Sequence, residues 1–415
     1  MGAGETQPVP TNSRWPWAGA RAPFACDPGR SRGRLAPERE SLTRSPFQRD
    51  RDRIIHSAAF RRLKHKTQVF VHHEGDFFRT RLSHTLEVAQ IARSISRQLG
   101  LDEDLAEAVA LAHDLGHTPF GHAGEEALAP AMAPYGGFSH NDQTLRILTA
   151  LERKYAEFDG LNLSWEALEG VVKHNGPLLP ESADKPLGPT IRNFRAAWDL
   201  ELDSWPSAEA QVAALSDDIA YNNHDLDDGL SAGLLILDEV RELPLVGPIL
   251  HDVEARYPGL ERSRTIHETI RRLIDAMVTD LISESRRRLD AAQPATVEDI
   301  RHAGTPLIGF SDAMHDADRA LRTFLWHRVY RHYTVNRMTS KARRIVTDLF
   351  DLLMAEPSCL PPEWQQRAAE EGAATGEQAG RARVIADFIA GMTDAAAMEE
   401  YRQLFDLTSR TWKSP

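Results

Sequence analysis

The chain has 415 residues, a formal net charge of −12 at pH 7 and 41% hydrophobic residues. This composition is ordinary for a globular protein, and the length allows two or three domains. The negative charge should repel nucleic acid, so a polyanionic substrate would have to be attracted by local basic groups. Two cysteines cannot form a disulfide framework, and the sequence has no apolar run of about 18 residues. We therefore expect a cytoplasmic protein without a membrane segment.

The N-terminal residues 1–45 are rich in Pro, Gly and Arg and show no apolar period. This pattern predicts a flexible N-terminal arm. Arg30, Arg32 and Arg34 could contact a phosphate or a neighbouring subunit, although such a run of charge favours a solvated tail.

From residue 45 to residue 70 the sequence combines dense basic charge with apolar residues at helical spacing. An exposed basic helix is the simplest interpretation. The alternative is a wall over a phosphate-bearing ligand, because guanidinium and ammonium groups bind phosphate oxygens. The candidate phosphate-binding residues are Arg61, Arg62, Lys64 and Lys66.

Residues 82–99 carry an apolar stripe at helical spacing, and Gly100 is a natural helix stop. His84 lies in the first turns of this predicted helix, where a single histidine is more often part of the core. Arg79 and Arg81 lie just before it, and this cationic pair could hold phosphate oxygens.

The most informative stretch is residues 111–126, LAHDLGHTPFGHAGEE. The preceding residues have helical spacing after a predicted N-cap at Asp102, so His113 and Asp114 fall in the last turn before Gly116. Imidazole and carboxylate are ligands that divalent ions accept. Neighbouring helical side chains point about 100° apart, so both reach one ion only beside the helix end. The polar residues gathered here are His113, Asp114, His117, His122 and Glu125, and His140 follows where a helix-capping or surface role is simplest.

In the segment AALSDDIAYNNHDLDDGL, Asp217, Tyr221 and Asp225 recur at helical spacing on one face, and Asp218, Asn222 and Asp225 form an alternative set. Crowded carboxylates repel one another unless a cation or hydrogen-bond donors lie nearby. We expect a further metal ligand from this segment, either Asp217 or Asp218; a solvated acidic face is the alternative.

Residues 231–355 have the pattern of successive amphipathic helices, from which an Arg or Tyr side chain could reach the site. The Ala, Glu and Gly content of residues 366–382 predicts a flexible loop, followed by a last helix to about residue 407. The sequence has no convincing alternating strand run, no GxGxxG and no Walker loop. We therefore predict an all-α fold with a main domain over residues 46–355 and a C-terminal helical extension over residues 356–415.

The order of His84, the His113-Asp114 pair and a distant aspartate resembles the ligand order of the HD metal-hydrolase superfamily. The closest resemblance is to the bacterial dGTPase-like deoxynucleoside triphosphate triphosphohydrolases. It is specific over residues 45–230, more diffuse to about residue 355, and does not cover the arm. It rests on the segments RDRIIHSAAFRRLKHKTQVF, EGDFFRTRLSHTLEVAQIAR, LAHDLGHTPFGHAGEEAL, GFSHNDQTLRIL, GVVKHNGP and ALSDDIAYNNHDLDDGL.

The resemblance implies an HD-domain helical core with additional C-terminal helices, and it implies roles for particular residues. One divalent metal ion (Mn, Mg, Fe or Zn) would be held by His84, His113, Asp114 and Asp217. The implied catalytic residues are His122 and Glu125, with His117 and His140 lining the same site. The implied substrate-binding residues are Gln68 at the sugar 3′-hydroxyl, Arg81 on the phosphates, and Tyr221 and Asp225 near the sugar.

The reaction that the resemblance implies is one hydrolysis at the α-phosphorus, which gives a deoxynucleoside and intact tripolyphosphate. The leaving 5′-oxygen is a poor leaving group and needs a general acid, and His122 oriented by Glu125 has suitable chemistry. Members of this family are commonly homo-oligomers, so we expect self-association, with deoxynucleoside triphosphates as substrate and as a candidate allosteric ligand between subunits.

Three other functions compete with this interpretation. Another HD phosphohydrolase, such as a nucleotidase or phosphodiesterase, is the nearest, but the basic segment 51–66 and the pair Tyr221 and Asp225 favour a triphosphate. A metalloprotease is disfavoured because Asp114 stands where a zincin needs Glu and Gly116 breaks the helix. A nucleotide-sensing or nucleic-acid-binding module with little activity is the third alternative.

Overall fold

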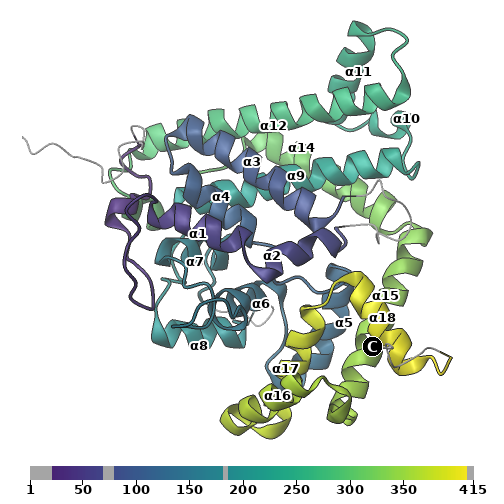
Figure 1. Ribbon diagram of the computed structural model, residues 1–415. Coiled ribbons are helices and arrows are strands. Elements are labelled where there is room, and N and C mark those ends of the chain that lie inside the picture. Colours follow the sequence, from purple (N-terminus) through teal and green to yellow (C-terminus); the bar gives the residue numbers. More distant parts are fainter. Residues whose placement is uncertain (1–20, 69–78, 181–185, 409–415) are drawn as a thin grey trace, which may run out of the picture.

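The computed structural model describes residues 21–68, 79–180 and 186–408, and within these ranges the chain is helical. The described residues form eighteen α-helices, and extended backbone pairs only as isolated bridges (Figure 1). The predicted all-α fold is therefore confirmed. Among the helices in these ranges, none has both the length and the apolar character needed to cross a bilayer.

The first half of the chain contributes α1 (Pro46–Ile55), α2 (Ala58–Arg62), α3 (Arg81–Leu99), α4 (Glu103–Ala112), α5 (His122–Met132), α6 (His140–Arg146), α7 (Trp165–Val172), α8 (Pro189–Ala197) and α9 (Ala208–Ser231). The second half contributes α10 (Leu237–Val240), α11 (Val246–Arg256), α12 (Arg262–Ala292), α13 (Val297–Arg301), α14 (Asp312–Leu325), α15 (Tyr333–Ala355), α16 (Pro362–Thr375), α17 (Glu377–Ala390) and α18 (Asp394–Phe405). A single π-helical turn, Trp326–Tyr330, separates α14 from α15.

Local signals in the sequence set the ends of the helices that carry the site. Gly100 ends α3 in the left-handed conformation, with φ 70°, as its position predicts. The side chain of Asp102 then accepts a hydrogen bond from the N–H of Leu105 and caps α4. The residue at the C-terminal cap of α4 is His113, so the His-Asp pair leaves the helix at its end.

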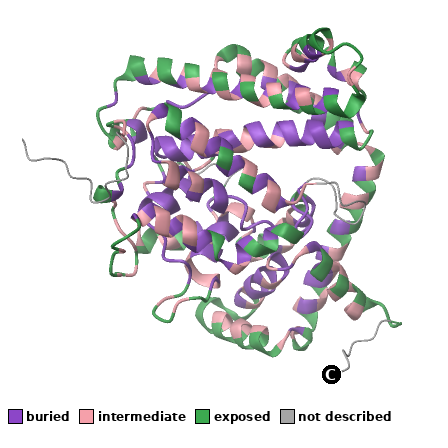
Figure 2. Ribbon diagram, turned by 45° about the horizontal axis from the view of Figure 1, so that its top comes forward, coloured by how far each residue is buried: buried purple, intermediate pink, exposed green. Residues whose placement is uncertain are grey.

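The first hydrophobic core forms where α3, α4 and α9 pack against one another, with α1, α7 and α12 packed onto this group. Helix α9 is buried along most of its length, which explains why its polar residues face the interior. In Figure 2 the buried residues concentrate on the inner helices, while the outer helices expose one face. The inner helices therefore provide a rigid frame for polar side chains.

A second hydrophobic core joins segments that are far apart in the sequence. It contains residues 120–138, from α5 and its flanks, together with residues 342–397 of the C-terminal helices. Helices α5, α15, α16, α17 and α18 lie together at the lower right of Figure 1. Since α15 packs against both α17 and α18, this core continues across the domain boundary expected at residue 355.

Residues 21–45 differ from the flexible arm that the composition predicted; residues 1–20 lie outside the described ranges. The guanidinium of Arg34 pairs with the buried carboxylate of Asp50. Arg32 stacks over the ring of Trp165, at 3.8 Å from the ring centroid, and pairs with Glu201. The segment is ordered because its basic residues find acidic and aromatic partners that are distant in sequence, which composition alone does not reveal.

Residues 366–382 also differ from the expected flexible loop, because α16 and α17 form a tight helical hairpin there. A Cβ atom on Gly380 would lie 2.3 Å from the backbone nitrogen of Gly372. The small residues that suggested flexibility therefore allow two helices to approach closely.

Candidate active site

Helices α3, α4 and α9 bring three predicted metal ligands together. His84 of α3, His113 at the end of α4 and Asp217 of α9 offer ligand atoms that all lie within 4.8 Å of one another. The Nε2 atom of His84 lies 2.8 Å from Oδ1 of Asp217, and Nε2 of His113 lies 3.5 Å from the same oxygen. This group, called here the His84 group, could hold a metal ion.

The protonation pattern of His113 fits a metal site. Its Nδ1 atom lies 2.6 Å from the carbonyl oxygen of Ala110 and donates to it, which leaves the lone pair on Nε2. That Nε2 atom is buried and has no hydrogen-bond partner among the described residues. Burial lowers the pKa of His113, yet Asp114 and Asp217 raise it to about 9. The two carboxylates therefore favour a cation at Nε2, which is a proton when the site holds no ion and would be replaced by a metal ion on binding.

Two further acids near the His84 group, the predicted ligand Asp114 and the alternative ligand Asp218, each pair with an arginine. Asp114 accepts a hydrogen bond from Arg81, with 2.7 Å between Nη1 and Oδ2, and its Oδ1 lies 3.0 Å from Nε2 of His117. It lies beside His113 but outside the set of ligand atoms within 4.8 Å, so its role as a ligand stays a prediction. Asp218 instead pairs with Arg322 at 2.9 Å, and burial raises the pKa of Asp218 to about 6.

His224, which the sequence analysis did not identify, contacts the His84 ring at the nitrogen that does not face Asp217. Its Nδ1 atom lies 3.2 Å from Nδ1 of His84, and its Nε2 atom is in ion-pair contact with Glu87. Helical spacing could have revealed both residues, because Glu87 lies three residues after His84 and His224 lies seven residues after Asp217.

The predicted catalytic residues form a second cluster at the start of α5 and α6. His117, His122, Glu125 and His140 offer atoms within 4.8 Å of one another. Both the backbone N–H and Nδ1 of His140 lie within 3.0 Å of the Glu125 carboxylate, and Nδ1 of His122 lies 3.4 Å from it. The ring of His117 stacks on that of His140, with centroids 4.1 Å apart.

The Glu125 carboxylate remains ionised because of these histidines. Burial raises the pKa of Glu125, but the hydrogen bonds from His122 and His140 outweigh it, so the pKa lies well below its usual range. The side chain of His122 is 56% exposed, whereas that of Glu125 is largely buried. The cluster therefore presents one accessible imidazole held by a buried negative charge, the arrangement of a general acid and its orienting carboxylate.

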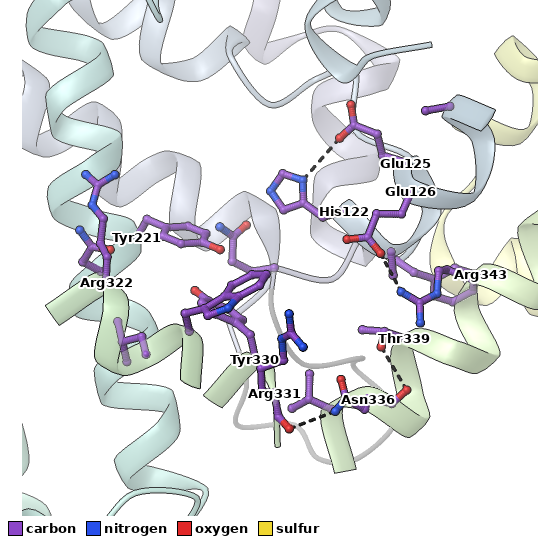
Figure 3. A pocket seen from close by; sticks show the side chains of 18 residues that line it. His122, Glu125, Glu126, Tyr221, Arg322, Tyr330, Arg331, Asn336, Thr339 and Arg343 are labelled. Atoms are coloured by element: carbon purple, nitrogen blue, oxygen red, sulfur yellow. Dashed lines mark hydrogen bonds and ion pairs between the residues drawn. The ribbon is translucent and has the colours of Figure 1, made fainter. Parts of the chain in front are cut away.

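A cavity of about 890 Å³ opens beside this cluster. Figure 3 shows His122 and Glu125 on one side of it and Tyr221 with Arg322 on the other. The π-helical turn Trp326–Tyr330 and the first turns of α15 complete the wall. This volume lies within the range of small-molecule sites and suits a nucleotide.

Two of the predicted substrate-binding residues, Gln68 and Tyr221, line the cavity, whereas Arg81 and Asp225 do not. The Oε1 atom of Gln68 and both carboxylate oxygens of Asp225 are buried without a hydrogen-bond partner in the described part of the chain. Burial raises the pKa of Asp225 well above its usual value, and Asp228 adds to this effect. The charged form of Asp225 is therefore disfavoured at this position.

Three arginines that line the cavity were not predicted individually. Arg322 pairs with Asp218, Arg343 pairs with Glu126 at 2.8 Å, and the guanidinium of Arg331 lies 5.1 Å from the centroid of the Trp326 ring. The sequence did indicate an anion-binding surface here, because residues 321–346 contain seven Lys and Arg residues and no acid, although the whole chain has a net charge of −12.

The basic residues at 61–66 do not form the wall over a phosphate-bearing ligand that the sequence offered as an alternative. Arg61, Arg62 and Lys64 are exposed and do not line the cavity. Lys66 is buried, and its ammonium donates to the carbonyl oxygens of His117 and Ala390, at 2.5 and 2.8 Å. This lysine holds backbone in place rather than facing the cavity.

Comparison with known proteins agrees with this geometry. The HD domain profile matches residues 81–222, which include the His84 group, and the profile of the phosphohydrolase-associated domain matches residues 308–403. A protein of Parvibaculum lavamentivorans named deoxyguanosinetriphosphate triphosphohydrolase-like is 58% identical over 389 residues, covering 94% of this chain and 97% of its own.

Proteins of the same name from two other organisms give similar values. That of Brucella anthropi is 58% identical and covers 94% of this chain and 96% of its own length. That of Cereibacter sphaeroides is 56% identical and covers 92% of this chain and 99% of its own. The arrangement of helices, the His84 group and these similarities agree: the chain belongs to the deoxyguanosinetriphosphate triphosphohydrolase-like family and contains the HD domain of metal-dependent hydrolases.

Proposed function

We propose that this protein hydrolyses deoxynucleoside triphosphates to a deoxynucleoside and tripolyphosphate, with one divalent metal ion in the His84 group. The observation that carries the proposal is the position of the His122–Glu125 pair. It faces a nucleotide-sized cavity lined by three arginines, and it is joined to the His84 group through His117 and Asp114. The proposed general acid and the proposed phosphate-binding cations line the cavity, and the His84 group is connected to them through Asp114 and His117.

His84, His113 and Asp217 would hold the metal, with Asp114 as the expected fourth ligand. When bound, the ion would polarise the α-phosphate and neutralise charge that develops on it. Arg81 keeps Asp114 oriented through its 2.7 Å hydrogen bond and compensates its charge. Arg81 would therefore orient a residue of the metal site, and it does not line the cavity.

A water oxygen would bond to the α-phosphorus and lose a proton, the bond from that phosphorus to the sugar 5′-oxygen would break, and the departing oxygen would take up a proton. His122 is the accessible imidazole of the cluster, and its Nδ1 atom lies 3.4 Å from the Glu125 carboxylate, which orients the ring. His140 shares the same carboxylate and stacks on His117, so it fixes Glu125 and His117 in place. We assign proton donation to His122 and orientation to Glu125 and His140.

Positioning and electrostatics dominate phosphoryl transfer, so the remaining cavity residues bind and align the substrate. The triphosphate would be held by three arginines that line the cavity, Arg322, Arg331 and Arg343. Gln68 and Tyr221 would contact the sugar, and a close fit there would leave no space for a ribose 2′-hydroxyl. Self-association and binding of a deoxynucleoside triphosphate between subunits extend the proposal and can be measured by light scattering with and without nucleotide.

Product analysis tests the proposal. Purified protein is incubated with Mn²⁺ or Mg²⁺ and each deoxynucleoside triphosphate, and products are separated by ion-exchange chromatography. We expect deoxynucleoside and tripolyphosphate, with loss of turnover in His113→Ala and strong reduction in His122→Ala. Release of monophosphate or free phosphate would assign the protein to other HD phosphohydrolases. Absence of turnover, even with mixed nucleotides, would favour a nucleotide-sensing module.

A further inference from the structure

Asp394, in the first turn of α18, connects the C-terminal helices to two segments of the cavity. Its side chain is buried, with 2% exposure. Oδ2 accepts hydrogen bonds from both the N–H and the hydroxyl of Thr67, and Oδ1 accepts one from the N–H of Phe120 at 2.8 Å. One carboxylate therefore holds two backbone segments that are separate in sequence.

Lys66 also connects the C-terminal helices to the residues around the cavity, through a positively charged ammonium instead of a carboxylate. Its ammonium donates to the carbonyl oxygen of Ala390, at the end of α17, and to that of His117. The backbone N–H of Arg81 in turn donates to the carbonyl of Lys66, at 3.1 Å. Together these bonds tie residues 390–394 to the residues on both sides of the site.

The segments held in this way carry groups that the reaction uses. Thr67 directly precedes Gln68, and Phe120 lies two residues before His122. Phe120 has φ 63°, a left-handed conformation that costs free energy for a residue with a side chain. Such a conformation persists only where neighbouring contacts enforce it, and the hydrogen bond to Asp394 is such a contact.

We propose that Asp394 is a positioning residue, through which the phosphohydrolase-associated segment sets Gln68 and His122 relative to the His84 group. The inference rests on the proposed function for the roles of Gln68 and His122. It gives the C-terminal helices a direct part in the active site, which a passive hydrophobic cover would not have.

Two observations separate this role from simple support of α18. The helix already has its own N-cap, since the hydroxyl of Thr393 accepts from the N–H of Ala396 at 3.2 Å. The helix is also attached elsewhere, through the Tyr401 hydroxyl, which donates to Asp348 of α15 at 3.1 Å. Asp394 is therefore not required to begin or to dock the helix, and its acceptor atoms are directed at the cavity segments.

The test compares Asp394→Asn with Tyr401→Phe, which loosens the same helix without touching the cavity segments. An asparagine has one acceptor oxygen, so it keeps one of the two connections and loses the other. Thr67→Val removes the hydroxyl with little change of volume, and Thr67→Ser restores it. Each variant is analysed for bound Mn²⁺, for kcat and KM with a deoxynucleoside triphosphate, and for amide hydrogen exchange in peptides that cover residues 66–68 and 117–122.

We expect Asp394→Asn to retain Mn²⁺ but to lower kcat/KM by about ten- to a hundredfold, the scale of a small misplacement of reacting groups. Thr67→Val should show a smaller loss that Thr67→Ser restores, and Tyr401→Phe should match the unmodified protein. Amide exchange should rise in Asp394→Asn in at least one of the two peptides, should rise less in residues 66–68 of Thr67→Val, and should stay unchanged in Thr67→Ser and Tyr401→Phe. This readout needs no turnover, so it tests the positioning role even if the unmodified protein hydrolyses no deoxynucleoside triphosphate.

The proposal is overturned if Asp394→Asn and Tyr401→Phe behave alike in exchange and in kinetics, because Asp394 would then only support the helix. Loss of Mn²⁺ in proportion to activity would also overturn it, since the defect would then be general unfolding. If Asp394→Asn does not fold, Thr67→Val and Thr67→Ser decide the matter: equal kinetics and equal exchange in these two variants would contradict the proposal.

Discussion

The Nδ1 atom of His84 lies 3.2 Å from Nδ1 of His224, so a second imidazole stands directly behind a predicted metal ligand. His224 contacts the carboxylate of Glu87 through its Nε2 atom. A carboxylate only accepts, so His224 carries its proton on Nε2 and accepts through Nδ1 from His84. The Nε2 atom of His84 lies 2.8 Å from Oδ1 of Asp217, so without an ion it carries a proton; a bound metal ion would take the place of that proton while His224 holds the other one on Nδ1.

Replacement of His224 by phenylalanine should weaken metal binding. The ring volume is kept, but His84 loses the acceptor that fixes its tautomer. Loss of such a partner typically lowers metal affinity by about ten- to a hundredfold. Titration with Mn²⁺ followed by calorimetry measures the change, and Gln90→Ala on the exposed face of α3 is the control. Equal affinity in His224→Phe and the unmodified protein would exclude a role for His224 at the metal.

Gly121 should not tolerate alanine. Its φ is 58°, and a Cβ atom there would lie 2.7 Å from Nη2 of Arg81, the residue that orients Asp114. We expect Gly121→Ala to fold but to lose at least about tenfold in kcat, because Arg81 must move away from the site. Gly137→Ala is the matched control: its φ is 85°, and its Cβ would meet no described atom within 4 Å. Similar kcat values for the two variants would mean that backbone strain, and not Arg81, is responsible.

Arg331 should contribute to substrate affinity. It lines the cavity, stacks on Trp326, and has no carboxylate partner among the residues that the structure describes. We expect Arg331→Ala to raise KM by about tenfold or more, the scale of one charge-assisted hydrogen bond, with a smaller change in kcat. Arg337→Ala is the control, because Arg337 also stacks on an aromatic ring, that of Tyr333, but lies outside the cavity. A KM that responds equally to both substitutions would indicate a general effect of charge.

The buried N-cap Asp102 should make the free energy of unfolding depend on pH. Burial raises the pKa of Asp102 from 3.8 to about 6, although Arg21 pairs with it and opposes the shift. Between these two values the folded chain binds more protons than the unfolded chain, so stability falls as pH rises. At about 1.4 kcal/mol per pKa unit, the cost at neutral pH is up to about 3 kcal/mol.

Asp102→Asn keeps the cap, because asparagine is an equally good N-cap residue, and removes the ionisation. Urea denaturation at pH 4.5, 6 and 7.5 should show a smaller fall in stability for this variant than for the unmodified protein. The difference between the two proteins isolates Asp102 from other buried acids such as Asp218. Asp104→Asn, which changes the same charge at a half-buried position of α4, serves as control. An identical fall in all three proteins would refute the assignment.

The parts of the fold that could be predicted are those set by local chemistry. Helical periodicity and the end signals Gly100 and Asp102 predicted α3 and α4, and they placed His113 at a helix end. Helical spacing placed Tyr221 on the face of Asp217, and the structure directs both to the site. The choice between Asp217 and Asp218 needed the packing of α14, because only that helix supplies Arg322 as a partner for Asp218.

The parts that could not be predicted depend on partners far along the chain. In the sequence, Arg34 lies in a basic stretch that is typical of a solvated tail. Only the fold shows that Asp50 lies beside it. In the sequence, Gly372 and Gly380 indicate flexibility. In the structure, two helices approach each other closely at these glycines. The cavity arginines belong to a basic stretch, and nothing local distinguishes Arg331, which lines the cavity, from Arg337, which does not.

The hydrogen bond between Phe120 and Asp394 spans 274 residues, and the one between Thr67 and Asp394 spans 327. Ribosomal synthesis delivers Asp394 after the histidines, the aspartates and the cavity wall have emerged. If Asp394 positions Gln68 and His122 as proposed, a nascent chain that lacks residue 394 has its metal ligands but not its positioned catalytic turn. Under the proposed activity, hydrolysis then begins only after residues 390–394 have been synthesised and have folded.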